Sequence, residues 1–205
     1  MNMATLTTSR LSQALIGAIV TCAWLYFAIL HVLAYFHTGA ASYLVFCLTE
    51  SLAALLFCIR SKVDSVSGAA SDWLLAVATT FMPLLFAPSS SSLWAGAEPL
   101  IFAGALLQAG GLLSLNRSIG IVPAVRVIKT GGMYRIVRHP LYAAYLVTFS
   151  GYLLANWSVG NLLVFGAWLC LLVMRIAREE AHLRCEGAYR AYMNRVKFRV
   201  LPYIF

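Results

Sequence analysis

The sequence predicts an all-α membrane protein, a polytopic bundle of about six transmembrane helices with further helices on the cytoplasmic side. Three observations predict this fold. Of 205 residues, 61% are hydrophobic and 11% are charged, whereas soluble domains carry about 25% charged residues. The apolar residues form long runs, and about 20 such residues cross a bilayer core of about 30 Å. The basic residues gather in the segments that follow every second run.

The length of each apolar run and the polar residues that flank it support its assignment as a membrane span. The first run is longer than the apolar core of a typical signal peptide, so we expect an uncleaved span. The fifth and sixth runs are short and only 156–161 divides them, which predicts a helical hairpin. The six predicted spans are 13–35, 41–59, 71–87, 95–115, 141–155 and 160–176.

The placement of charge predicts the orientation of these spans. The chain has 15 Lys and Arg against seven Asp and Glu, a net charge of +8. The cations precede the first run or follow the second, fourth and sixth runs. By the positive-inside rule that side is cytoplasmic, with both termini inside. The charge therefore orients a multi-pass protein among membrane lipids, and we expect no nucleic-acid partner.

The cysteines give no sign of a metal or redox site. They are odd in number and contain no C-x-x-C pair, which excludes a zinc ribbon and favours small buried hydrophobic side chains. We therefore predict no metal ligands. The five are Cys22, Cys47, Cys58, Cys170 and Cys185.

Polar residues persist in the segment 114–142, between the fourth and fifth runs. Gly131 and Gly132 permit a turn that other residues resist, and Pro140 suits the first turn of a helix. The start of that helix presents free N–H groups beside Arg138 and His139, which suits an anionic or electron-rich cofactor group. The alternative is that the basic residues only anchor the loop to lipid headgroups.

The tail from Arg175 predicts a helix that leaves the membrane. Its charges fall at i,i+4 spacing, which stabilises a helix by a few tenths of a kcal/mol per pair. The adjacent carboxylates Glu179 and Glu180 can instead receive an ammonium group. The predicted pairs are Arg175 with Glu179, Glu180 with Arg184, and Glu186 with Arg190.

These two segments together resemble a known family. The motif Gly132-x-Tyr134-x-x-x-Arg138-His139-Pro140-x-Tyr142 precedes Glu179-Glu180, and Tyr189-x-x-Tyr192-x-x-x-Val196-x-x-x-x-Leu201-Pro202 follows. This order resembles the isoprenylcysteine carboxyl methyltransferases and their phospholipid N-methyltransferase relatives. The resemblance covers 112–205. It implies an integral membrane methyltransferase that uses S-adenosylmethionine, with no Rossmann sheet.

The resemblance also implies a division of the chain and a set of site residues. Within one membrane domain, 1–205, the spans of 1–111 would serve substrate access and packing, and 112–205 would hold the cofactor. Where the family usually has Gly, two residues after the motif Tyr, this chain has Ala144, whose methyl group narrows the expected cleft. The implied catalytic residues are Arg138, His139 and Glu180. The implied cofactor-binding residues are Tyr134, Arg138, His139, Pro140, Tyr142, Glu179 and Glu180.

Methyl transfer from a sulfonium mainly requires alignment of donor and acceptor. A carboxylate acceptor needs no base, and its loss of charge is favoured in a poorly hydrated site. An amine or thiol acceptor must lose a proton, for which His139 or a tail glutamate is the candidate base. We expect a lipophilic acceptor that enters from the bilayer, a carboxylate before an amine or thiol. We also expect a glutamate beside the donor's ammonium and Arg138 beside its carboxylate.

Glu50, near the middle of the second span, is a functional candidate because a carboxylate there is costly unless it is protonated, paired or facing a cavity. Its nearest predicted partner is His31. Two other functions remain open: an NADPH-dependent enzyme similar to the sterol reductases, and a polytopic scaffold or transporter that uses Glu50 with His31. Asn116 and Arg117 are further candidates for lining a cofactor site.

Overall fold

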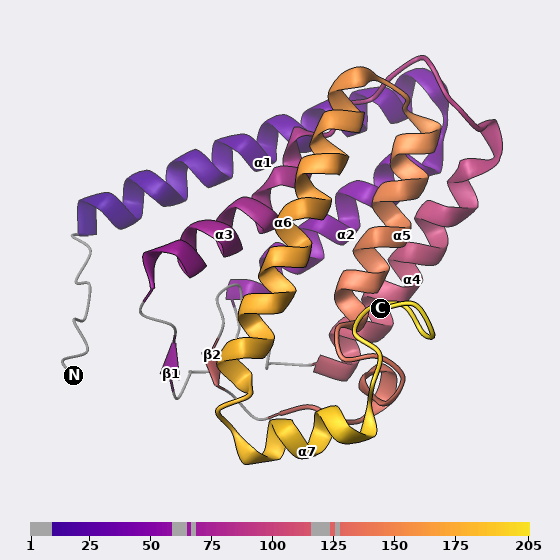
Figure 1. Ribbon diagram of the computed structural model, residues 1–205. Helices are drawn as coiled ribbons and strands as arrows, with labels where there is room; N and C mark the ends of the chain where they lie inside the picture. Colours follow the sequence, from indigo (N-terminus) through magenta and orange to yellow (C-terminus); the bar gives the residue numbers. More distant parts are fainter. Residues whose placement is uncertain (1–9, 59–64, 67–68, 116–123, 126–127) are drawn as a thin grey trace.

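The computed structural model describes residues 10–58, 65–66, 69–115, 124–125 and 128–205 (Figure 1). These residues hold seven α-helices and one pair of two-residue strands, so the predicted helical fold is confirmed. Two apolar stretches of the described chain, Ala95–Leu115 and Val159–Leu183, are long enough to cross a membrane. The helices are α1 Arg10–Thr38, α2 Ala41–Cys58, α3 Ala70–Phe81, α4 Glu98–Leu115, α5 Pro140–Ala155, α6 Val159–Leu183 and α7 Gly187–Arg195.

Two helix ends differ from the predicted runs for local reasons. The third run does not form one helix, because α3 ends at Phe81 and a 3-10 turn, Met82–Leu85, follows. Pro83 in this turn has no N–H to continue the α-helical hydrogen bonds. The sixth run, in contrast, continues without a break to Leu183. The acidic pair of the tail is thus on the same rigid helix as the last apolar run.

Aromatic rings from α1, α2 and α5 fill the core. The Phe46 ring stacks on Tyr152 at 4.5 Å between centroids and meets Phe149 edge-on at 5.8 Å. His31, fully buried, lies against them, with Nδ1 2.8 Å from the Phe27 carbonyl oxygen and Nε2 2.7 Å from the Tyr152 hydroxyl. Both ring nitrogens are therefore engaged within this cluster. The predicted pairing of His31 with Glu50 is wrong, because Tyr152 takes the place of that partner.

Helices α4 and α5 pack closely because small residues line their contact. A Cβ on Gly104 would collide with Thr148, and one on Gly111 would come within 2.8 Å of Leu141. Small residues let helix backbones approach in this way inside membranes. The close contact fixes the start of α5 against the end of α4.

Asparagine side chains tie the connection between α5 and α6 to the rest of the bundle. Asn156 Oδ1 accepts from the Tyr43 hydroxyl at 2.6 Å, and Asn161 Nδ2 donates to the Asn156 carbonyl oxygen at 2.7 Å. Ser158 caps α6 by accepting from the Asn161 N–H at 3.0 Å. These bonds satisfy polar groups where the chain reverses.

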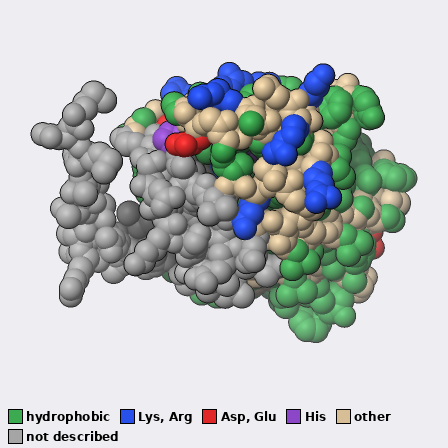
Figure 2. Space-filling model, turned by 90° about the horizontal axis from the view of Figure 1, so that it is seen from below, with side chains coloured by type: hydrophobic (Ala, Val, Ile, Leu, Met, Phe, Trp, Pro, Cys, Tyr) green, Lys and Arg blue, Asp and Glu red, His purple; other side chains and the backbone are tan. Residues whose placement is uncertain are grey.

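Basic residues gather at the opposite end of the molecule, which carries α7. Lys and Arg side chains lie over much of this end (Figure 2). Strands β1, Ser65–Val66, and β2, Ala124–Val125, pair antiparallel, so the segments that follow α2 and α4 meet. Both segments were predicted to lie on the cytoplasmic side.

The prediction that the cysteines are buried is wrong for three of them. Cys22, Cys170 and Cys185 are exposed on the isolated chain, and Cys47 is partly buried. The apolar surfaces of α4 and α6 face outward in the same way, as Leu106, 75% exposed, illustrates. Exposed apolar side chains on these helices suit a lipid environment rather than water.

Candidate functional site

The segment before α5 is shaped by a glycine turn. Gly132 has a φ of +57°, and a Cβ there would collide with Ser114 at the end of α4. Only glycine combines that φ with that contact at low cost. The Met133 N–H donates to Ser114 Oγ at 3.3 Å, which holds the following 3-10 turn, Gly132–Arg135, on α4. His139 then precedes α5 and Pro140 occupies its first turn, as predicted.

Glu180 is the centre of the polar network beside α5. Its Oε1 accepts from Arg138 Nε at 2.8 Å and lies 3.2 Å from His139 Nε2. Its Oε2 accepts from Arg199 Nε at 3.1 Å and lies 3.5 Å from Arg184 Nη2. The Glu180 side chain is only 1% exposed. A carboxylate surrounded by so many cationic donors is held in its charged form.

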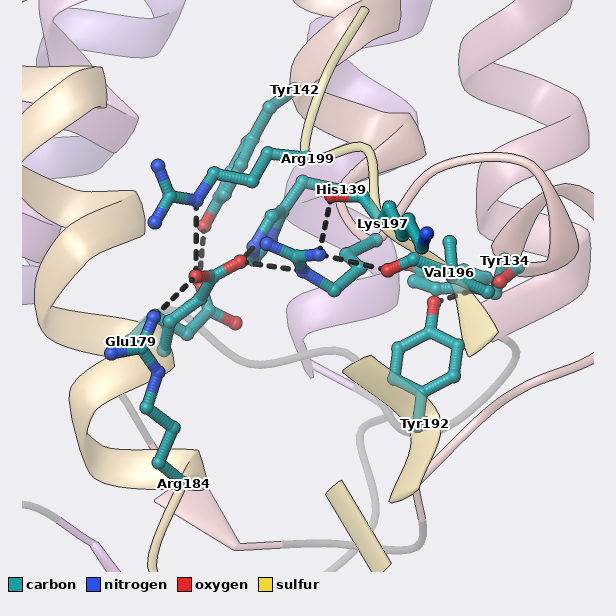
Figure 3. A network of polar contacts seen from close by, with 11 residues as sticks. Tyr134, His139, Tyr142, Glu179, Arg184, Tyr192, Val196, Lys197 and Arg199 are labelled. Carbon is teal, nitrogen blue, oxygen red and sulfur yellow. Dashed lines mark hydrogen bonds and ion pairs between the residues drawn. The ribbon is translucent and has the colours of Figure 1, made fainter. Parts of the chain in front are cut away.

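The tail after α7 passes across the start of α5 and closes the network (Figure 3). Arg138 Nη1 donates to the carbonyl oxygens of Val196 at 2.8 Å and Lys197 at 2.7 Å. The N–H of Arg138 donates to the Phe198 carbonyl oxygen at 2.9 Å, and the N–H of His139 to that of Arg199 at 2.8 Å. We call 196–199 the tail strap. The guanidinium of Arg138 is thus committed to both Glu180 and the strap.

Glu179 occupies a different setting from its neighbour. It is partly buried, and its Oε2 accepts from the Tyr142 hydroxyl at 2.8 Å. The Tyr142 ring stacks on His139, with 5.3 Å between centroids, and the Arg175 guanidinium carbon lies 5.4 Å from the centroid of the Tyr142 ring. Tyr142 therefore links the imidazole, the guanidinium and the carboxylate.

Tyrosines of α7 cover the outer side of this site. The Tyr192 hydroxyl donates to the Tyr134 carbonyl oxygen at 2.8 Å, and burial raises the pKa of Tyr192 to about 12. Its hydroxyl therefore remains a donor at physiological pH. The Tyr189 hydroxyl is buried, has no hydrogen-bond partner among the described residues, and interacts electrostatically with Glu179 and Glu180. Such an orphan hydroxyl at a polar site is explained when a ligand supplies the partner.

The structure brings all the predicted site residues to one end of the bundle. Arg138 and His139 both contact Glu180, Tyr142 binds Glu179, and the Tyr134 carbonyl oxygen accepts from the Tyr192 hydroxyl. Ala144, fully buried, lies further along α5. Asn116 and Arg117 lie outside the described residues. No group of three or more His, Cys, Asp or Glu in the described ranges is arranged to hold a metal.

Arg199 and Tyr189 are site residues that sequence reasoning did not single out. Arg199 is 19 positions from Glu180, so no helical spacing connects them. Tyr189 occurs in the motif, but only its packing reveals the unsatisfied hydroxyl. The tail motif therefore contained a signal for Tyr189, whereas Arg199 lies at an unspecified position between Val196 and Leu201 and no sequence signal pointed to it.

The arrangement has charges of both signs placed for a zwitterionic ligand. Around Glu180 guanidinium groups outnumber carboxylates, which favours an added anion. Glu179, with one described hydrogen-bond partner and partial exposure, favours an added cation. The amino-acid portion of S-adenosylmethionine carries both charges, so the residues present fit this cofactor.

Comparison with known proteins identifies a family for part of the chain. Residues 101–189 match the family model described as phospholipid methyltransferase. The matched segment includes most of α4, all of α5 and α6, and the Arg138-His139-Pro140 segment between α4 and α5. The resemblance predicted from the sequence is thereby confirmed for this segment. No curated protein matches the chain.

Proposed function

We propose that this chain, whose residues 101–189 match the phospholipid methyltransferase family model, transfers a methyl group from S-adenosylmethionine to a lipophilic acceptor. The observation that carries the proposal lies within the matched segment and the adjoining tail. Arg138, His139, Tyr142 and the acidic pair meet at one end of an apolar bundle. A site in this position can receive the cofactor from the aqueous side and the acceptor from the bilayer.

The proposed topology is six spans with both termini in the cytoplasm and the last two spans as a hairpin. Three residues, 156–158, separate α5 from α6. The β1–β2 pair and the basic surface around α7 support a common side for the basic segments (Figure 2). The positive-inside rule assigns that side to the cytoplasm. Residues 1–111 would then admit or pack against the acceptor, and 112–205 would hold the cofactor.

We assign the cofactor's charged groups to different residues of the site. Glu180 is saturated by protein cations, so we place the ammonium at Glu179 rather than at Glu180. We place the cofactor's carboxylate at the guanidinium groups around Glu180. The Tyr189 hydroxyl, which has no partner among the described residues, can donate to an acceptor atom of the cofactor. Glu180 and Arg138 then act by holding His139 and the tail strap in place. We place Tyr134 and Pro140 in the lining of the same cofactor site.

The chemistry that the bound cofactor supplies is an electrophilic methyl group on a sulfonium. The chain's own residues align the reactants and exclude water, which together supply much of the rate in such displacements. We propose a carboxylate acceptor in preference to an amine or a thiol. For a carboxylate acceptor, no residue needs to remove a proton. For an amine or thiol, His139 takes that proton, and the nearby Glu180 carboxylate stabilises the imidazolium.

Methyl transfer is tested directly with the purified protein in lipid nanodiscs. S-adenosylmethionine labelled with tritium in its methyl group is supplied with three separate acceptors: an S-prenylated N-acylcysteine, phosphatidylethanolamine and a long-chain thiol. We expect label to enter at least one acceptor, and we expect the carboxylate of the S-prenylated N-acylcysteine to be labelled in preference to the other two. His139→Ala is expected to lower the rate about 10²-fold or more. Absence of label from all three acceptors, with the cofactor bound, would contradict the proposal.

A further inference from the structure

One side chain of α2 and one of α4 each have a buried oxygen atom without a hydrogen bond among the described residues. Gln108 is fully buried; its Nε2 donates to the Thr49 carbonyl oxygen at 3.0 Å, but its Oε1 has no partner among the described residues. Glu50 follows Thr49 in α2, and its buried Oε1 likewise has no partner there. Neither atom is used by the site around Glu180.

A tyrosine of α5 lies near both Glu50 and the proposed methyl-transfer site. Tyr145 interacts electrostatically with both Glu50 and Arg175. It lies three residues, almost one helical turn, beyond Tyr142, which binds Glu179. Glu50 therefore lies deeper in the bundle than the basic end, along the α5 face that begins at His139.

The chemistry of the two orphan atoms defines what they can bind. A buried polar atom without a hydrogen bond costs free energy, and in a membrane that cost is not relieved by water. The Gln108 side chain already uses an N–H on Thr49, so the atom left over is a carbonyl oxygen, which only accepts. The buried Glu50 oxygen is also able to accept, as a carboxylate oxygen or as the carbonyl oxygen of a neutral carboxyl group. An N–H or O–H group can therefore satisfy both atoms.

We propose that Glu50 and Gln108 bind an N–H or O–H group of the lipophilic acceptor, next to the position where it is methylated. The proposal rests on the proposed methyl-transfer function and adds a binding determinant to it. An acceptor that carries only apolar groups and a carboxylate leaves both oxygens unsatisfied. The donor has two chemical sources, the amine of a lipid headgroup or the amide N–H of a lipid-modified amino acid.

The experiment uses photoreactive lipids with the full chain in nanodiscs containing S-adenosylhomocysteine. The probes are a long-chain amine, an N-acyl amino acid with a long-chain side group, and a long-chain methyl ether without any donor, each with a diazirine near the polar end. We expect strong labelling near Glu50 by the amine, the amide or both, and weak labelling by the ether. Labelling by one donor alone identifies its source.

Two variants separate ligand binding from a structural role. Glu50→Leu removes an unsatisfied oxygen, so the thermal midpoint is expected to rise about 2–4 °C. Labelling by the donor probes is expected to fall about tenfold, the effect of one hydrogen bond. Gln108→Met is expected to reduce labelling similarly. Thr79→Val is the control, because the Thr79 hydroxyl bonds only its own helix, at the Leu75 carbonyl oxygen, in the described structure.

The failure of this inference is distinct from the failure of the methyl-transfer proposal. Calorimetric binding of S-adenosylhomocysteine is expected to stay within about twofold in Glu50→Leu and Gln108→Met, since neither side chain contacts the described cofactor site. Unchanged donor labelling in both variants, or equal labelling by the ether probe, would overturn the acceptor site. Failure of the wild-type chain to bind S-adenosylhomocysteine would instead overturn the proposed function.

Discussion

Glu180→Gln is expected to have the largest effect of any single substitution in the polar network. The change leaves Arg138, His139 and Arg199 facing a neutral amide in a setting where Glu180 is 1% exposed. Removing one partner of a buried ion pair costs about 3–5 kcal/mol, because the other charge stays buried. The thermal midpoint of unfolding is therefore expected to fall about 6–20 °C. Differential scanning fluorimetry of the detergent-purified protein measures this shift.

The same substitution is expected to abolish methyl transfer. Without its carboxylate, His139 and the tail strap lose the group that holds them together. Glu186→Gln is the matched control, because Glu186 is a partly exposed carboxylate at the start of α7. Its midpoint is expected to change by about 1 °C or less. An unchanged midpoint and rate in Glu180→Gln would show that the network does not support the site.

Arg138→Lys is expected to release the tail strap although it preserves the charge. An ammonium cannot reproduce the planar fork by which Arg138 reaches Glu180, Val196 and Lys197 together. Trypsin is therefore expected to cleave within 195–199 faster in the variant. Methyl transfer is expected to fall about 10²-fold, the cost of misplacing reacting groups by about 1 Å.

Arg178→Lys provides the comparison for this prediction. The Arg178 side chain is 58% exposed and its Nη1 lies 3.8 Å from Oδ1 of the largely buried Asp72, a contact outside the network. We expect wild-type proteolysis and activity in this variant, because lysine keeps the positive charge near Asp72 and Arg178 has no described contact with Glu180 or the tail strap. Equal proteolysis of the strap in wild type and Arg138→Lys would contradict the role given to Arg138.

The parts of the fold that were predictable are those with a local cause. Pro140 marks the start of α5 because proline suits the first helical turn, and it lies there in the structure. The fourth run forms a helix with a short 3-10 start. The break after α3 also has a local cause, Pro83, which the length of the apolar run concealed. The number of membrane spans stays a prediction.

Side-chain pairing was less predictable, because helical spacing competes with tertiary contacts. The predicted Glu180–Arg184 pair forms at 3.5 Å. Arg190, in contrast, donates to the carbonyl oxygens of Arg184 and Cys185 rather than to Glu186. Glu179 binds Tyr142, 37 positions away. Pairwise spacing along one helix contains no information about such long-range partners.

The residues of the candidate site were predictable from the sequence, but the separate role of each residue was not. Glu179 and Glu180 are equivalent in the sequence, whereas burial and ion pairing distinguish them in the structure. The strap contact of Arg138 depends on how the tail returns to α5, which no local pattern specifies. The resemblance supplied the residues, and the geometry supplies the hypothesis about their roles.

The central claim, that this end of the bundle binds a methyl donor, is tested most directly by isothermal titration calorimetry. S-adenosylhomocysteine and NADPH are titrated separately into the detergent-purified full chain. We expect saturable binding of S-adenosylhomocysteine at about one site per chain and no saturable binding of NADPH. Binding of NADPH without binding of S-adenosylhomocysteine would contradict the central claim and favour a reductase.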